Sequence, residues 1–120
     1  MANDKKMLAA AAAVAISSSN RSADNRTFLL GAVGMRRDGV IVSARNVSAL
    51  DFAPRHHAEA RLSRKMTPDS TVWVARVLKN GTWAMAKPCH GCLILMRAAG
   101  IRRAVYTISH NEWGVIEINS

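Results

Sequence analysis

Residues 71–108, TVWVARVLKNGTWAMAKPCHGCLILMRAAGIRRAVYTI, contain the alternation of strand and helix patterns that decides the fold. Apolar and β-branched runs predict strands, and a glycine between two such runs predicts a turn. Pro88 opens a predicted helix that Gly100 ends, because proline is favoured at the first helical position and glycine just past the last. In order, we expect a strand over 71–78, a turn over 79–81, a short return strand over 83–86, a helix over 89–99 and a strand over 102–108.

The preceding half of the chain continues this alternation. Asn3 and Asp4 are suitable caps for an alanine-rich first helix. Gly31 and Gly34 allow another element to approach the backbone of the strand that contains them. In order, we expect a helix over 4–18, a polar break over 19–25, a strand over 27–35, a turn over 37–39, a strand over 40–44, an irregular segment over 45–55 and an amphipathic helix over 57–66.

The end of the chain predicts a turn over 111–114 and a last strand over 115–118. A parallel crossover needs a dozen or more residues, whereas the connection here is short enough only for a hairpin. The last two strands are therefore expected to be antiparallel. The whole pattern predicts one domain over 1–120, a three-layer α/β/α sandwich around a five-stranded mixed sheet.

The charge of the chain is strongly positive, with 17 Lys and Arg against 8 Asp and Glu and a formal net charge of +9. A positive electrostatic field attracts phosphates on nucleotides, DNA or RNA. Solubility alone is the other explanation of the same charge. The apolar stretch over 7–16 is far too short to span a membrane, so we expect no membrane association.

Cysteine usage is sparse: Cys89 and Cys92 are the only two and form a C-x-x-C. A disulfide between them would close a tiny loop and stabilise little. A reduced pair that binds metal or takes part in redox chemistry fits better, and it indicates a cytoplasmic protein.

Two short motifs, His57-Ala58-Glu59 and Pro88 to Cys92 (PCHGC), each fall at the start of a predicted helix. Cys89 and Cys92 project from one helical face, at a helix end whose partial positive charge stabilises thiolates. With His57 they make three zinc ligands and leave a fourth position for water. Glu59 points to a different side from His57, so it lies beside that water and acts as a proton shuttle.

Other uses of these residues remain open. The C-x-x-C could be a redox pair, and His56 or His90 could instead complete a purely structural Cys2His2 zinc site, which would leave Glu59 without a role. Only His57 stands two residues before the glutamate. His110, near the last turn, faces either solvent or the entrance of the site.

The H-x-E and P-C-x-x-C pair is the signature of zinc deaminases, and the chain resembles the cytidine deaminase-like superfamily over nearly its whole length. The resemblance implies a Zn²⁺ cofactor held by His57, Cys89 and Cys92, with Glu59 as the catalytic acid and base. It also implies self-association into a homo-oligomer. The substrate contacts that it implies are Asn46, Ala58 and Pro88.

The short final hairpin resembles the division that holds free-cytidine deaminases, blasticidin deaminase and several DNA-acting deaminase toxins. Asn46-Val47 match a segment that binds sugar hydroxyls in free-cytidine deaminases, but Ser48 replaces its glutamate. His57 replaces the cysteine usual in the tetrameric members. We expect hydrolytic deamination of cytosine to uracil in free cytidine, deoxycytidine or a nucleotide of either.

Two alternatives to the deamination of a free cytosine compound remain open. Single-stranded DNA or RNA is favoured by the charge and by three tryptophans that could stack on bases, although tryptophans more often lie in a core or a subunit interface. A zinc-stabilised binding module is a third possibility, against which Glu59 argues. The stacking candidates are Trp73, Trp83 and Trp113, and strand residues that could line a base pocket or the core are Phe28, Leu30 and Val33.

Overall fold

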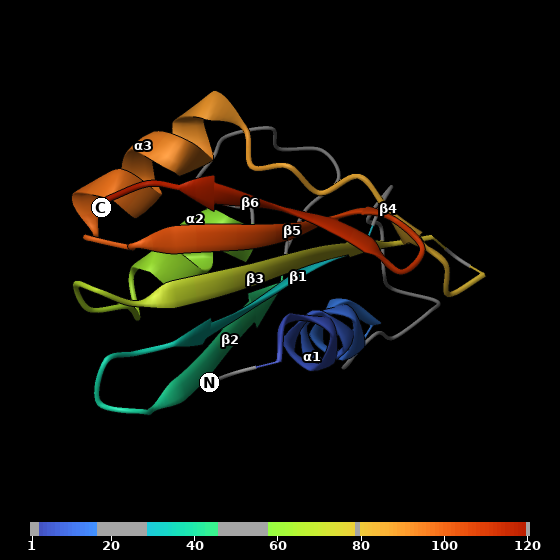
Figure 1. The fold of residues 1–120 in the computed structure, drawn as a ribbon, viewed down its shortest axis with the longest axis horizontal. Helices are drawn as coiled ribbons and strands as arrows, with labels where there is room; N and C mark the ends of the chain where they lie inside the picture. Colours follow the sequence, from blue (N-terminus) through green and yellow to red (C-terminus); the bar gives the residue numbers. More distant parts are fainter. Residues whose placement is uncertain (1–2, 17–28, 46–57, 79, 120) are drawn as a thin grey trace.

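The computed structural model describes residues 3–16, 29–45, 58–78 and 80–119, with the backbone alone for 59–61. Three helices and six strands alternate along these residues (Figure 1). They are α1 (Asp4–Ile16), β1 (Leu29–Met35), β2 (Ile41–Arg45), α2 (Ala58–Ser63), β3 (Thr71–Val77), β4 (Trp83–Ala84), α3 (His90–Ala98), β5 (Arg103–Ser109) and β6 (Glu112–Glu117). None of the helices in this described part is long and apolar enough to cross a membrane.

The strands form one open mixed sheet in the order β2-β1-β3-β5-β6. β3 and β5 are parallel, and the other neighbours on this path are antiparallel, including β5 with β6. The two-residue strand β4 pairs with Arg76 and Val77 at the end of β3. These residues lie just beyond the part of β3, residues 71–74, that pairs with β5. The prediction of a five-stranded mixed sheet with an antiparallel last pair is confirmed, with β4 as a short addition.

The helices lie in two layers, α1 on one face of the sheet and α2 with α3 on the other (Figure 1). Leu8 of α1 packs with Trp73 and Val105 on one face. Leu62 of α2 and Met96 of α3 join a core on the opposite face, with members of β1, β3 and β5. Burial of this apolar surface is the main stabilising contribution, so the α/β/α sandwich follows from the strand alternation.

Gly31 allows α1 to lie directly on β1. A Cβ atom built at this position would lie 2.6 Å from the backbone nitrogen of Ala15. On the other face, a Cβ at Gly34 would lie 2.5 Å from Sδ of Met66. The close approach expected at both glycines is confirmed, by a helix backbone at one and a side chain at the other.

The first helix begins as expected, with Oδ1 of Asn3 accepting a hydrogen bond from Lys6 N at 3.1 Å. Asp4 has a different role, because its carboxylate accepts from Nε1 of Trp73 at 2.9 Å and lies 3.5 Å from Arg103. The helix predicted over 57–66 ends earlier, at Ser63. The turn after it is tighter, because the backbone N–H groups of Lys65 and Met66 donate to carbonyls only three residues back, those of Leu62 and Ser63.

The last turn lies earlier than predicted, at residues 110–111 instead of 111–114. Asn111 has a φ of 63°, a left-handed conformation that asparagine tolerates better than most residues. The chain therefore reverses in two residues, and β6 already begins at Glu112. Trp113 and Gly114 belong to the strand, which corrects the prediction that placed them in a turn.

Candidate active site

The starts of α2 and α3 lie at the same edge of the sheet. Residues 64–70 lead from α2 into β3, and residues 99–102 lead from α3 into β5, while β3 and β5 run parallel. Both helices therefore run antiparallel to these strands and begin at the edge where the strands end, as Figure 1 shows. This arrangement places the backbone of Ala58 and Glu59 at the same edge as Cys89 and Cys92.

The two cysteines occupy the N-terminal end of α3. Cys89 is the N-cap, with φ −70° and ψ 166°, so the helix begins one residue later than predicted. Its Sγ accepts a hydrogen bond from the backbone nitrogen of Cys92 at 3.4 Å. Such a contact satisfies one of the N–H groups that a helix start leaves unpaired, and it holds the sulfur at the positive end of the helix dipole.

The donor set at this helix end fits a zinc ion. Cys89 is exposed, Cys92 is buried, and the two are not joined by a disulfide. Thiolates with two residues between them, as in a C-x-x-C, are common zinc ligands. Within the described side chains no group of three His, Cys, Asp or Glu could hold a metal. His57 lies outside the described residues, as does the side chain of Glu59, so the complete ligand set stays a prediction.

Two of the predicted substrate contacts are described. Ala58, the first residue of α2, is fully buried, and Pro88, just before Cys89, is also buried. Asn46 lies outside the described residues, together with His56. His90 is exposed in the first turn of α3.

The base-pocket hypothesis fails for one strand residue. Val33 packs against Ala11 and Ala75 on the α1 face, away from α2 and α3. Leu30 belongs to the core on the α2 and α3 face, which is compatible with a position behind the site. Phe28 lies outside the described residues.

The tryptophans belong to the core and not to an exposed stacking surface. Trp73 is 1% exposed, Trp83 is 9% exposed, and both belong to the cluster around Leu8 on the α1 face. Trp113 is half-buried against the same cluster. The interpretation of Trp73 and Trp83 as stacking residues is therefore wrong, and their interpretation as core residues is confirmed.

His110 is exposed and lies against Trp83, which links the β5–β6 turn to β4. Its Nδ1 accepts from the backbone nitrogen of Trp83 at 3.4 Å. The two rings meet edge to face, with centroids 5.8 Å apart. This contact places His110 beside the segment that leads toward Pro88.

Thr107 holds the segment that precedes Cys89, although the sequence pattern did not single it out. Its buried Oγ1 donates to the carbonyl oxygen of Ala84 at 2.6 Å and accepts from the backbone nitrogen of Arg76 at 3.2 Å. Its own carbonyl accepts from Ala86 N at 2.9 Å. One side chain thus joins β3, β4 and β5 and fixes the segment that leads directly to Cys89.

Replacing Thr107 by valine is expected to lower the free energy of unfolding by about 2 kcal/mol, because two buried hydrogen bonds are lost at constant shape. The loosened segment before Cys89 should also weaken metal binding. Urea denaturation and zinc titration measure the two effects. Thr71→Val on β3 is the matched control, expected to change stability by less than about 0.5 kcal/mol. Equal midpoints for the two variants would contradict this role of Thr107.

Comparison with known proteins gives a family and a fold. The family model described as "Cytidine and deoxycytidylate deaminase zinc-binding region" matches residues 1–108. No curated protein sequence matches the chain. The crystal structure of cytidine deaminase from Burkholderia pseudomallei is similar, with a TM-score of 0.68 and 20% sequence identity. The match covers 98% of this chain and 94% of that chain, and it shows that the two share a fold.

Proposed function

We propose, given that this chain belongs to the cytidine and deoxycytidylate deaminase zinc-binding family, that it converts cytosine to uracil in a free nucleoside or nucleotide. The substrates would be cytidine, deoxycytidine or their nucleotides. The reaction consumes one water and releases one ammonia. The family match spans both motifs and the elements between them, which supports the assignment of the chemistry to the edge where α2 and α3 begin.

The zinc site of this proposal consists of His57, Cys89 and Cys92. When bound, zinc would supply Lewis-acid activation of a water molecule. Glu59 would take one proton from that water and deliver it to the ring nitrogen of the base, and would then take the second proton, from the hydroxyl added at C4, and deliver it to the amine that leaves as ammonia. Its place two residues after His57 is consistent with this role, since a residue at that spacing does not share the direction of a ligand.

The observation that carries the choice of cytosine as the base is the β5–β6 hairpin. The two strands pair antiparallel and are joined by a turn at residues 110–111, so no helix lies between them. This arrangement supports a place among the C-terminal-hairpin deaminases, the division that holds the free-cytidine enzymes together with several DNA-acting toxins. The burial of Trp73 and Trp83 removes one argument for a polynucleotide substrate.

The net charge of +9 favours a second candidate, cytosine within single-stranded DNA or RNA. Zinc-loaded protein incubated separately with cytidine, deoxycytidine, their monophosphates, adenosine and a cytosine-containing oligonucleotide distinguishes the two. We expect ammonia release from at least one free cytosine compound. Conversion of the oligonucleotide alone would overturn the proposed substrate class in favour of the second candidate.

A further inference from the structure

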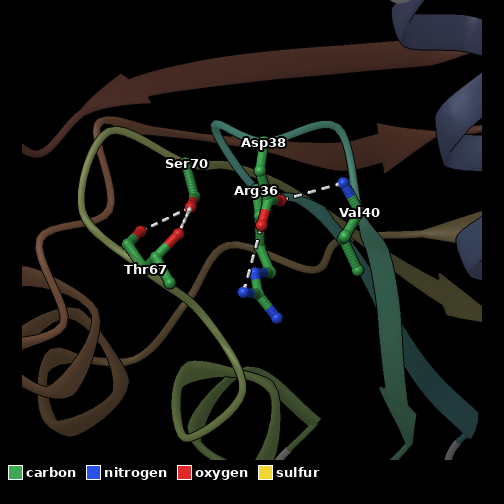
Figure 2. A network of polar contacts seen from close by, with 5 residues as sticks. All are labelled: Arg36, Asp38, Val40, Thr67 and Ser70. Carbon is green, nitrogen blue, oxygen red and sulfur yellow. Dashed lines mark hydrogen bonds and ion pairs between the residues drawn. The ribbon is translucent and has the colours of Figure 1, made fainter.

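At the end of the sheet opposite the cysteines, three segments that connect helices or strands contact one another. Arg37 of the β1–β2 turn lies 3.4 Å from Asp69 in the α2–β3 connection. Asp69 N donates to the carbonyl of Gly100, and Arg102 N donates to the carbonyl of Ser70, which adds the α3–β5 connection. Figure 2 shows the first two segments, each with its own internal hydrogen bonds. They form a fixed frame at the edge where β3 and β5 begin.

Exposed cations lie in these three connections and in the last turn of α3, which leads into one of them. We call them the basic surface: Arg37, Arg64, Lys65, Arg97 and Arg102. Two nearby carboxylates are already engaged, because Asp69 pairs with Arg37 and Asp38 pairs with Arg36 at 3.2 Å. Within the described part of the chain, Arg64, Arg97 and Arg102 form no ion pair. The surface therefore keeps an uncompensated positive charge.

The backbone that carries two of these cations is held firmly. Nδ2 of Asn119 donates to the carbonyl of Arg97 at 3.2 Å and to that of Ile101 at 2.9 Å. The carbonyl of Arg102 accepts from the backbone nitrogens of Ile118 and Asn119. A partner that binds here would need to order only side chains, which lowers the entropic cost of association.

We propose that the basic surface binds the phosphate backbone of a nucleic-acid strand. Arginine and lysine that lack an acidic partner bind successive phosphates and release their counterions. Arg97 follows Cys89 by eight residues, a distance of about 12 Å along α3, so phosphates held here leave the cysteine edge open. The inference is independent of the proposed function, because it concerns binding at another place on the molecule.

The test uses the full chain and a fluorescein-labelled single-stranded oligonucleotide, with anisotropy measured over a range of salt concentrations. The variant is Arg64→Gln/Arg97→Gln/Arg102→Gln. Its matched control is Lys5→Gln/Lys6→Gln/Lys87→Gln, which removes the same charge from two exposed positions of α1, on the opposite face of the sheet, and from one beside the cysteines. We expect the variant to lose about tenfold or more in affinity at low salt. Its slope of log K against log salt should shrink by about 2, since each phosphate contact contributes about 0.7.

Three results would overturn the proposal. Wild-type protein could fail to bind the oligonucleotide, or the variant and its control could lose affinity equally, which would indicate only diffuse attraction by net charge. Polyglutamate could also compete as well as unlabelled oligonucleotide, which would assign the surface to acidic polypeptides. Because no turnover is needed, an inactive protein serves equally well, and failure of the proposed function leaves this result unaffected.

Discussion

Glu59→Gln is expected to reduce the turnover number for cytosine deamination by about three orders of magnitude while zinc content stays at the wild-type level. General acid–base groups contribute about 10²–10⁴-fold to rate, and here one carboxylate serves both proton transfers. Glutamine keeps the shape of the side chain but cannot accept and return a proton. Glu59 is the second residue of α2, whose start lies at the same edge as Cys89.

Steady-state kinetics on the best free substrate and metal analysis on the same sample measure the two quantities. Glu117→Gln, at an exposed position of β6, is the control and should leave both unchanged. An active Glu59→Gln protein with full zinc would refute the proton shuttle. A variant that loses zinc along with activity would instead make Glu59 a metal ligand.

Local patterns predicted most of the elements because the cause of each lies within a few residues. Turn residues 37–39 form as expected: Gly39 has a φ of 88° and donates to the carbonyl of Arg36. Pro88 and Gly100 bracket α3, and the Cys89 cap follows from their positions. The position of the starts of α2 and α3 at one edge also follows from the order of the elements, because short connections leave few topologies.

Gly114 shows where such patterns fail. The sequence pattern predicts a turn at this glycine, yet a Cβ there would lie 2.7 Å from the ring of Tyr106 on the neighbouring strand. The glycine is needed for close packing, and Asn111 makes the turn instead. A single sequence does not distinguish these two causes, because the residue that requires the glycine lies on another strand.

The candidate site shows the same division between local and long-range causes. The cysteine spacing is local and was predicted. The role of Thr107 was missed because its partners, Ala84 and Arg76, come from two other strands. The tryptophans were ambiguous for a related reason, since nothing near Trp73 in the sequence identifies Asp4 as the acceptor of its indole N–H.

Cys92→Ser is expected to abolish stable zinc binding and to remove the stability that depends on the metal. Cys92 is fully buried in the first turn of α3, at the helix end that Cys89 caps. Serine has a similar size but does not supply a thiolate, so the proposed site loses one of three protein ligands. A metal that binds only the folded chain stabilises it by about 4 kcal/mol when its concentration is roughly a thousandfold above Kd.

Because zinc binding and folding are coupled, the response of thermal stability to zinc tests the ligand role of Cys92 more directly than the stability alone. Thermal unfolding is measured for wild type and Cys92→Ser, each with added zinc and with a chelator. Wild type should lose stability in chelator, whereas the variant should unfold at one temperature in both conditions, close to that of chelated wild type. A buried hydroxyl also destabilises the core, so a lower Tm alone does not identify a zinc ligand. The decisive result is a Tm that does not change between zinc and chelator. A variant that binds one zinc per chain and responds to chelator like wild type would show that Cys92 is not a ligand.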